Sequence, residues 1–321
     1  MADRLTYAMI GGGIGAFIGE VHRRAVSLDD RATLVAGALS STPEKSKQSA
    51  EQLGLDPERS YGRYQELFEQ ESKRDDRVDF VSIVTPNDTH YPIAKMALEH
   101  GFHVVLDKPA THTSEQAAEL ARLAESKGLV CCVTYNYTGY PMVRQARAMI
   151  EEGTFGAIRK VYAEYHQGWL ANDLEASGQK QAAWRAHGVL TASQVCIGEG
   201  NGLTLRVHGD KGSLWWRQET PDELRVALHD QNPVIYSRGG PDLHEDAEVS
   251  ARIPQGHPEG YLEAFANIYK GAIDAIIAHR DGSAPSRMAQ LIPTINDGMR
   301  GVRFVERCVQ SAKKNAQVDW A

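Results

Sequence analysis

The sequence contains few cysteines and no long apolar run. Its four cysteines are Cys131, Cys132, Cys196 and Cys308. None belongs to a Cys-x-x-Cys pair, and no metal site is predicted; we expect reduced packing residues in a cytoplasmic protein. No apolar run approaches the roughly 18 residues that a membrane helix needs. The first residues include Asp3 and Arg4, which argues against a secretory signal.

Basic residues are not in excess either. The chain has 35 Lys and Arg against 42 Asp and Glu, a net charge of -7. This balance argues against nucleic acid and against an anionic membrane surface as partners. With 321 residues, 42% hydrophobic and 24% charged, the composition is that of a globular protein with room for two domains.

Short apolar strands alternate with helices through the first half of the chain. We predict strands at residues 5–10, 33–39, 78–84, 102–106 and 129–134, and helices at 20–28, 43–53, 63–70, 91–100 and 114–127. This alternation is typical of an α/β fold with a parallel, doubly wound sheet. In such sheets, ligands bind at the carboxyl ends of the strands.

A glycine-rich turn follows the first strand. Gly11, Gly13 and Ala16 fit the pattern Gly-x-Gly-x-x-Gly/Ala, and Gly15 with Gly19 gives a second, looser fit. Glycines let backbone amides approach a pyrophosphate, whose charge then faces a helix N-terminus. A flexible loop is the alternative, but the flanking strand and helix favour dinucleotide binding. The predicted cofactor contacts are Gly11, Gly13, Gly15, Ala16, Phe17 and Ile18.

The second strand ends without the carboxylate that an NAD-preferring site uses to hold the ribose. Ser40 and Ser41 stand there instead, with Lys45 nearby. Hydroxyl groups leave room for a 2′-phosphate, and a lysine supplies positive charge. The same residues suit a simple helix N-terminus, and Glu44 still offers a carboxylate for NAD. We therefore predict an NAD(P) cofactor, with NADP favoured and with Ser40, Ser41 and Lys45 as contacts.

Polar turns follow the third and fourth strands. Pro109 ends the fourth strand and biases Lys108 toward extended torsions, so the lysine lies at the carboxyl end of the sheet. Lys108 is thus the predicted catalytic residue, a candidate for proton transfer, although an isolated Asp-Lys-Pro is more often a surface ion pair. The predicted cofactor contacts in these turns, and after the fifth strand, are Thr85, Pro86, Asn87, His90, Asp107, Lys108 and Asn136.

In this order, these motifs resemble the glucose-fructose oxidoreductase / inositol dehydrogenase / rhizopine catabolism (Gfo/Idh/MocA) family. The resemblance covers essentially the whole chain and is most specific at the Lys-Pro corner and at residues 256–261, Gly-His-Pro-Glu-Gly-Tyr. It implies a Rossmann-type NAD(P)-binding domain at 1–137. Residues 138–321 would form an α/β domain with a large, mostly antiparallel open sheet, with the C-terminal helix packing back on the first domain.

The resemblance also implies a small-molecule partner and an assembly. Substrates would be sugars, polyols or their keto forms, and Lys108 would contact the substrate and the nicotinamide region. The open sheet would join copies of the chain into a dimer or tetramer. Trp169 suits sugar stacking but equally suits packing. The candidate substrate contacts are His166, Trp169, His257 and Tyr261.

One element of the family pattern is missing. The family's catalytic pair, an Asp with a His four residues later, does not occur between Trp184 and Thr191. A helix and at least two strands are absent at the Ala186–His187 join. His187 is a candidate acid or base there, although a turn histidine is the stronger interpretation. Three explanations are open: the chain is naturally shortened, or it is engineered or recombined, or the sequence omits a disordered stretch.

Three functions follow as hypotheses. The first is an NAD(P)-dependent oxidoreductase that transfers a hydride between nicotinamide and a CH-OH carbon of a sugar, polyol or keto-sugar, impaired by loss of the Asp…His segment. The second is an NAD(P)-binding protein without dehydrogenase activity, a sensor or an assembly subunit. The third is a glycosidase that uses NAD transiently.

Overall fold

The computed structural model describes residues 4–167, 191–316 and 318–319. These residues form two compact units that are not continuous in the chain. The first comprises residues up to Gly139 together with Tyr261–Glu306, and the second comprises Tyr140–Gly260 together with the chain from Arg307 onward. We predicted a division after residue 137, with the C-terminal helix packing back on the first domain; the late segment that belongs to the first unit is Tyr261–Glu306.

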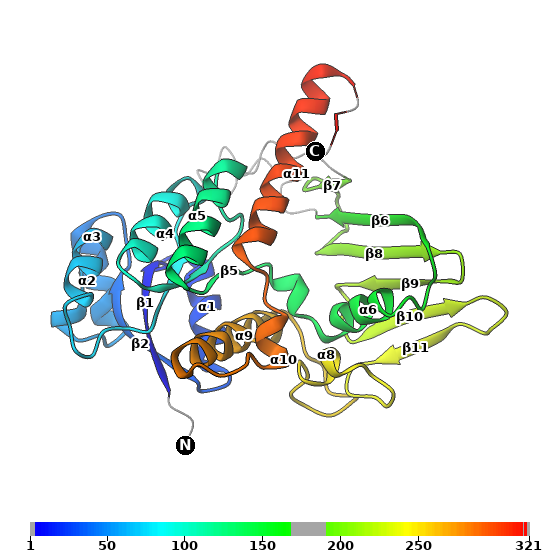
Figure 1. The fold of residues 1–321 in the computed structure, drawn as a ribbon, viewed down its shortest axis with the longest axis horizontal. Helices are drawn as coiled ribbons and strands as arrows, with labels where there is room; N and C mark the ends of the chain where they lie inside the picture. Colours follow the sequence, from blue (N-terminus) through cyan, green and yellow to red (C-terminus); the bar gives the residue numbers. More distant parts are fainter. Residues whose placement is uncertain (1–3, 168–190, 317, 320–321) are drawn as a thin grey trace. The chain divides into compact units, whose positions relative to one another are not determined.

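The first unit is built on a parallel sheet of five strands in the order β2-β1-β3-β4-β5 (Figure 1). The strands are β1 (Leu5–Gly11), β2 (Ala32–Ala38), β3 (Phe80–Val84), β4 (His103–Leu106) and β5 (Cys131–Val133). From β1 the chain adds β2 on one side and β3 on the other. The direction of winding therefore reverses at β1, which creates a crevice at the carboxyl ends of β1 and β3.

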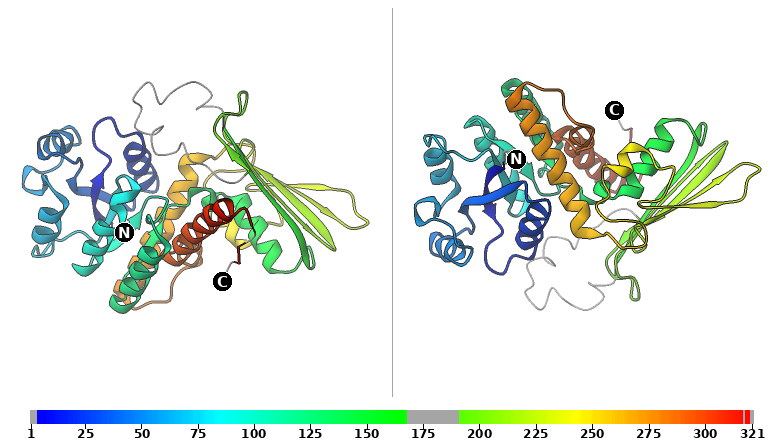
Figure 2. Two further views of the ribbon diagram at one scale, coloured as in Figure 1. Left: turned by 90° about the horizontal axis from the view of Figure 1, so that it is seen from above. Right: turned by 90° about the horizontal axis from the view of Figure 1, so that it is seen from below.

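Helices cover both faces of this sheet (Figure 2). They are α1 (Phe17–Ser27), α2 (Pro43–Gln52), α3 (Tyr64–Glu71), α4 (His90–Glu99), α5 (Ser114–Lys127), α9 (Tyr261–Asp281), α10 (Arg287–Gln290) and the first part of α11 (Ile295–Lys314). Successive strand residues point to opposite faces. Met9 of β1 therefore lies in a core with α1 and α9, whereas Ile10 lies in a core with α3, α4 and α5.

The second unit contains a six-stranded sheet in the order β11-β10-β9-β8-β6-β7. Its elements are α6 (Pro141–Glu151), β6 (Ile158–His166), β7 (Ala192–Ser193), β8 (Gly202–Gly209), β9 (Gly212–Arg217), β10 (Glu223–Leu228), β11 (Val234–Ser237) and α8 (Glu245–Glu248). Neighbouring strands are antiparallel except for β6 and β7, which are parallel. The predicted α/β class, with one parallel and one mostly antiparallel sheet, is confirmed.

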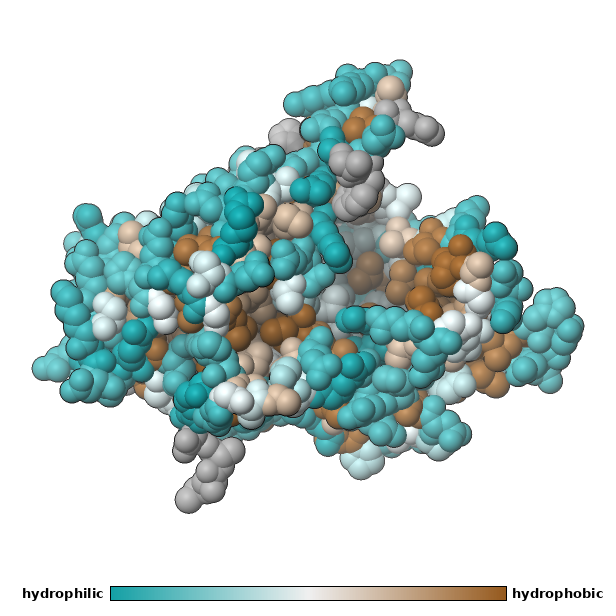
Figure 3. All heavy atoms as spheres, in the orientation of Figure 1, coloured by the Kyte–Doolittle hydropathy of each residue, from teal (hydrophilic) through white to brown (hydrophobic). Residues whose placement is uncertain are grey.

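One face of the second sheet is apolar along its whole width but is unevenly covered. Leu224 and Trp216 face each other across β10 and β9 and are almost fully buried beside α6. At the other end, Ala163 pairs with Leu205, and Val161 of β6 is 57% exposed. Figure 3 shows hydrophobic residues gathered over this β6 and β8 part of the sheet. The β6 end is thus less covered than the β10 end.

The sequence also suggests Ser114 as the N-cap of its helix and a strand at residues 188–196, and the structure corrects both. Helix α5 is capped by Thr113 in a capping box with Gln116, whereas the Ser114 hydroxyl donates to Glu306 at 2.6 Å. Within its described part, the suggested strand is reduced to the two residues of β7. Within the parts of the chain that the structure describes, no helix is long and apolar enough to cross a membrane.

Candidate cofactor and catalytic site

The glycine turn after β1 depends on close backbone contacts. Gly11 and Gly12 have φ angles of +77° and +72°, in the left-handed region where a Cβ is disfavoured. A Cβ on Gly19, in the first turn of α1, would lie 2.2 Å from the carbonyl oxygen of Gly12. The helix can therefore approach the turn only because position 19 is glycine. Sequence reasoning missed Gly12 and placed Gly19 only in the looser pattern.

Neighbouring elements fix the turn in place. The amide of Gly13 donates to the Leu39 carbonyl at 3.0 Å, and the amide of Ile14 donates to Ser49 Oγ at 3.1 Å. Arg23 of α1 donates to the Gly12 carbonyl at 2.6 Å. Neither Arg23 nor Ser49 was predicted, because their role depends on contacts between elements and not on a motif.

The N-terminus of α1 is open toward the turn. Its N-cap residue, Ala16, makes no side-chain cap hydrogen bond, so the first amides of the helix have no such partner. Phe17 is 64% exposed, whereas Ile18 packs against the core. Gly15 has a φ angle of +78° and open space where a Cβ would lie. Amides without a side-chain cap at a helix N-terminus, beside a glycine turn, fit a pyrophosphate group.

The end of β2 is held by a chain of three hydrogen bonds. Leu39 N donates to Ser46 Oγ at 2.7 Å, Ser46 Oγ donates to the Tyr61 carbonyl at 2.6 Å, and Tyr61 N donates to the Gly37 carbonyl at 2.9 Å. The predicted ribose contacts follow Leu39 directly in the sequence or lie in the first turn of α2. Ser40 is half-buried, and Ser41 and Lys45 are exposed. The N-cap of α2, Thr42, makes no side-chain cap hydrogen bond.

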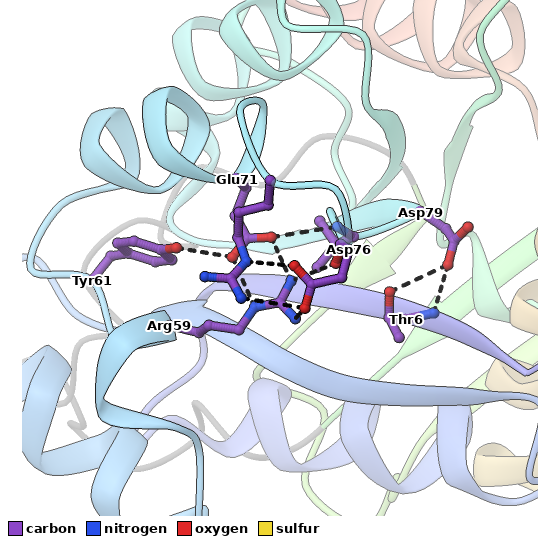
Figure 4. A network of polar contacts seen from close by, with 8 residues as sticks. Thr6, Arg59, Tyr61, Glu71, Asp76 and Asp79 are labelled. Carbon is purple, nitrogen blue, oxygen red and sulfur yellow. Dashed lines mark hydrogen bonds and ion pairs between the residues drawn. The ribbon is translucent and has the colours of Figure 1, made fainter.

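A buried ion pair lies next to Tyr61, one of the residues of this hydrogen-bonded chain (Figure 4). Arg59 Nη2 and Glu71 Oε2 are 2.5 Å apart, and the side chains are 9% and 0% exposed. The Tyr61 hydroxyl donates to the other Glu71 oxygen at 2.9 Å. Asp76 also contacts Arg59, at 3.4 Å. The carboxylate of Glu71 is thus paired and hydrogen-bonded, as a buried charge requires.

His90 joins the turns that follow β3 and β4. Its Nε2 lies 2.8 Å from the Thr85 carbonyl and its Nδ1 lies 2.8 Å from the Pro109 carbonyl. The side chain is 1% exposed, and both ring nitrogens are engaged. Pro86 is exposed and Asn87 is half-buried on the outer side of the turn. The geometry therefore gives His90 a supporting role behind the predicted cofactor contacts.

Asp107 points inward from the end of β4. Thr134 Oγ1 donates to its Oδ1 at 2.9 Å, and His22 Nε2 lies 3.5 Å from the same oxygen. Burial raises the pKa of Asp107, but His22 and the charge of Lys108 outweigh burial and lower this pKa to about 2. The carboxylate is therefore ionised at neutral pH, next to a half-buried Lys108.

Asn136 follows β5 at the same edge of the sheet. It is 4% exposed, and its Nδ2 is buried without a hydrogen-bond partner among the described residues. An orphaned buried donor is costly unless a ligand satisfies it. Together with the glycine cradle and the open helix N-terminus, this donor fits a dinucleotide that extends along the strand ends from β1 to β5.

The predicted substrate contacts are distributed over both units. His166, at the end of β6, lies with its Nδ1 3.8 Å from Cys196 Sγ. His257 is exposed in the loop after α8, and its carbonyl accepts a hydrogen bond from the buried Arg238. In the first unit, the ring of Tyr261 packs edge-on against Phe265 at 5.1 Å. Trp169 and the Ala186–His187 join lie outside the described residues.

Comparison with known proteins identifies the class. Residues 5–135 match the oxidoreductase family with an NAD-binding Rossmann fold, and residues 186–319 match the C-terminal α/β domain of the same family. The fold, the glycine turn and these matches define a two-domain, NAD(P)-dependent oxidoreductase. The chain belongs to the Gfo/Idh/MocA family, as its motifs predicted.

Relatives and solved structures extend over nearly the whole chain. An uncharacterized oxidoreductase of Bacillus subtilis, YfiI, is 32% identical, over 97% of this chain and 95% of its own. An inositol dehydrogenase homolog from Azotobacter vinelandii, solved with NADH and myo-inositol, is 34% identical with a TM-score of 0.88, covering 98% and 97% of the two chains. An oxidoreductase from Sinorhizobium meliloti is 40% identical with a TM-score of 0.87, covering 98% of each chain.

The alignment with the Bacillus relative spans 378 residues, more than the 321 residues of this chain. It must therefore include residues of the relative that have no counterpart here. Levoglucosan dehydrogenase of Pseudarthrobacter phenanthrenivorans, 30% identical, aligns over 400 residues that cover 99% of this chain. This chain is thus shorter than both relatives over the region that they share.

Proposed function

We propose that this protein transfers a hydride between NAD(P) and a CH-OH carbon of a sugar or cyclic polyol, at the carboxyl ends of β1, β3, β4 and β5. The observation that carries the proposal is the placement of Lys108 and the orphaned Asn136 Nδ2 at the edge of the sheet that also holds the glycine turn. The myo-inositol in the solved Azotobacter neighbour supports a cyclic polyol as the substrate class.

Each residue of the edge has a distinct role. The amides at the start of α1 bind the pyrophosphate, and Asn136 Nδ2 donates to the nicotinamide half of the cofactor. When bound, the nicotinamide accepts or returns the hydride. Lys108 holds a proton at the substrate oxygen and polarises the C–O bond, with the Asp107 carboxylate beside it.

The site accepts either cofactor under this proposal, with NADP favoured. Ser40, Ser41 and Thr42 present hydroxyl groups where a carboxylate would repel a 2′-phosphate, and Lys45 is exposed in the first turn of α2. Two solved neighbours contain NADH or NAD+, which supports binding of the unphosphorylated form as well.

Turnover is low under this proposal. The sequence contains no Asp followed four residues later by His, the pair that the family uses for proton transfer. General acid–base groups are typically worth about 10²- to 10⁴-fold in rate. The exposed Val161 at the β6 end of the second sheet is consistent with loss of an element that covers this face. We also propose that copies associate through the second sheet, because such apolar surface favours assembly.

The decisive experiment measures binding and turnover separately on a chain of verified intact mass. Titrations of intrinsic fluorescence with NADH and NADPH should show saturable binding. A panel of inositols, aldoses and keto-sugars at saturating cofactor should show turnover well below ~1 s⁻¹. Absence of binding for both cofactors would refute the proposed function. Turnover at ordinary enzyme rates would instead refute only the impairment.

Binding without turnover on any substrate would favour the second function, a nucleotide-binding protein without dehydrogenase activity. The missing Asp…His pair is the observation that keeps this candidate open. Product release from a glycoside with no net change in cofactor would point to the glycosidase instead.

A further inference from the structure

A buried chain of three hydrogen-bonded side chains ends next to the Asp107 carboxylate. Ser82 Oγ of β3 lies 2.7 Å from the Tyr269 hydroxyl of α9, which lies 2.6 Å from Nδ1 of His22 in α1. The other ring nitrogen, Nε2, faces Asp107 Oδ1 at 3.5 Å. All four residues are nearly or fully buried, with Asp107 the most exposed at 8%. Residues from three elements of the first unit thus meet the turn that follows β4, next to the Lys108–Pro109 corner.

The charge of Asp107 determines which atom donates in each contact of this chain. An ionised Asp107 can only accept, so a lone pair on His22 Nε2 would face a negative charge. Nε2 therefore carries a proton. If His22 is neutral, Nδ1 must accept, the Tyr269 hydroxyl must donate to Nδ1, and the Ser82 hydroxyl must donate to Tyr269. Both hydroxyl donors then have acceptors, whereas the Nε2 proton faces Asp107 Oδ1 across 3.5 Å, which is longer than a hydrogen bond.

A doubly protonated His22 is the competing state. Burying an additional ion costs several kcal/mol, and a charge-assisted N–H···O bond that would offset this cost is about 2.7–2.9 Å long. The observed 3.5 Å is well outside this range. The geometry therefore favours a neutral imidazole that orients the carboxylate without neutralising it.

We propose that Ser82, Tyr269 and His22 form a positioning network for the Asp107–Lys108 corner, in which His22 is neutral and protonated on Nε2. These residues do not touch the substrate or the cofactor. They hold the carboxylate so that Lys108 keeps its position and its charge. The same network connects the corner to α1, whose N-terminus lies at the glycine turn. The predicted effect on turnover rests on the proposed function, whereas the protonation pattern does not.

The first test is spectroscopic and needs no enzyme activity. Long-range 1H–15N correlation spectra of the full chain, labelled at histidine, distinguish the two neutral tautomers and the imidazolium. A His22→Gln variant assigns the His22 signals. At pH 7, His22 should show a protonated Nε2 and an unprotonated Nδ1. A protonated Nδ1, in either a neutral or a charged ring, would overturn the proposed network.

The second test separates positioning from general stability. Tyr269→Phe removes the central hydroxyl, and Tyr7→Phe is the matched control in the same core, stacked on Phe80 at 5.1 Å. Tyr269→Phe should lower kcat about tenfold while the Kd for NADH changes less than about twofold, because small displacements of catalytic groups are costly in rate. Tyr7→Phe should change neither value.

The spectroscopic test and the kinetic test have different outcomes that would contradict the proposal. Equal losses in both variants, or a loss of NADH affinity that matches the loss of kcat, would make Tyr269 a purely structural residue and overturn the network. If unmodified protein binds NADH but turns over too slowly to compare variants, the histidine spectra alone decide the proposal. If it binds no NADH, the proposed function fails, and the spectra still decide whether the chain of donors exists.

Discussion

Gly19 and Gly12 are in direct backbone contact: a methyl group on Gly19 would lie 2.2 Å from the Gly12 carbonyl oxygen. This contact brings the start of α1 against the glycine turn. The proposed dinucleotide site therefore depends on a glycine inside a helix, where the residue is intrinsically unfavourable.

Gly19→Ala should accordingly disable the site. The added methyl group forces α1 away from the turn, so we expect NADH affinity to fall at least tenfold and stability to fall by roughly 1–3 kcal/mol, as is usual for overpacking. Gly260→Ala is the control, because a Cβ there meets open space. Calorimetric titration with NADH checks the first effect. Unchanged affinity in Gly19→Ala would show that the turn relaxes without cost.

Lys108→Met should separate catalysis from cofactor binding. The methionine keeps an unbranched side chain and removes the charge, so kcat should fall about 10²-fold or more while NADPH affinity stays nearly constant. Lys127→Met, on the exposed end of α5, should leave both values unchanged. A variant that loses NADPH binding as severely as turnover would make Lys108 a cofactor-binding residue instead.

Ser40→Asp should reverse the preference between cofactors. In the unmodified protein we expect NADPH to bind at least as tightly as NADH, because hydroxyl groups and Lys45 surround the end of β2. A carboxylate at position 40 repels a 2′-phosphate and accepts from ribose hydroxyls, so NADH should then bind more tightly. Ser213→Asp, in the second sheet, controls for the added charge. Tighter binding of NADH by the unmodified chain would contradict this prediction.

Glu71→Gln should destabilise the first unit strongly. The substitution leaves the buried Arg59 without its counter-ion, and breaking a buried pair typically costs about 3–5 kcal/mol. Glu119→Gln is the matched control, since its pair with Lys95 is 42% and 36% exposed, and such pairs are worth about 1 kcal/mol or less. Urea unfolding of both variants gives the comparison. Similar midpoints for the two would show that Arg59 finds another partner.

The folded state should lose stability as the pH falls below the ordinary pKa of histidine. Burial, with a smaller contribution from nearby His279, lowers the pKa of His103 to about 4, below the ordinary 6.5. The unfolded chain therefore binds a proton between these values that the folded chain does not. As pH falls from 6.5 to about 4, the folded state should lose about 3 kcal/mol relative to the unfolded state.

His103→Asn tests this assignment, because an asparagine oxygen can replace Nδ1 as acceptor for the Val130 amide, which donates to it at 2.9 Å. The acid loss between pH 6.5 and 4.5 should largely disappear in this variant. It should persist in His229→Asn, whose histidine is 76% exposed. An unchanged pH dependence in His103→Asn would place the titrating group elsewhere. Protonation of Asp107 belongs to a lower window, between about pH 4 and 2.

Local patterns were sufficient for most elements of the first unit. Helix α5 begins and ends where its sequence predicts, at Ser114 and Lys127, because the capping residues and Gly128 act within one turn of the helix. Helix α6 was not predicted, although Pro141 stands in its first turn and Met142, Ala146 and Met149 are buried along one face. The apolar face of α6 packs against β9 and β10, which come later in the chain, so the residues of α6 alone did not indicate what this face would bury.

Side-chain direction at the strand ends could not be predicted in the same way. Sequence reasoning grouped His90 and Asp107 with the cofactor contacts, because both stand in turns at the carboxyl edge of the sheet. The structure places both inside, where His90 bonds two carbonyls and Asp107 faces Thr134 and His22. Proximity in a motif does not specify which side of a turn a side chain occupies.

The sequence by itself determined the alternation of strands and helices, the glycine turn and the lysine corner, because turn chemistry and periodicity act over a few residues. Only the tertiary structure decided that α9, more than 100 residues beyond β5, covers the first sheet and brings Tyr269 to His22. Burial of a polar group is acceptable only when partners from several elements converge on it. The partners of His22 come from segments far apart in the sequence, so only the packed chain brings them together.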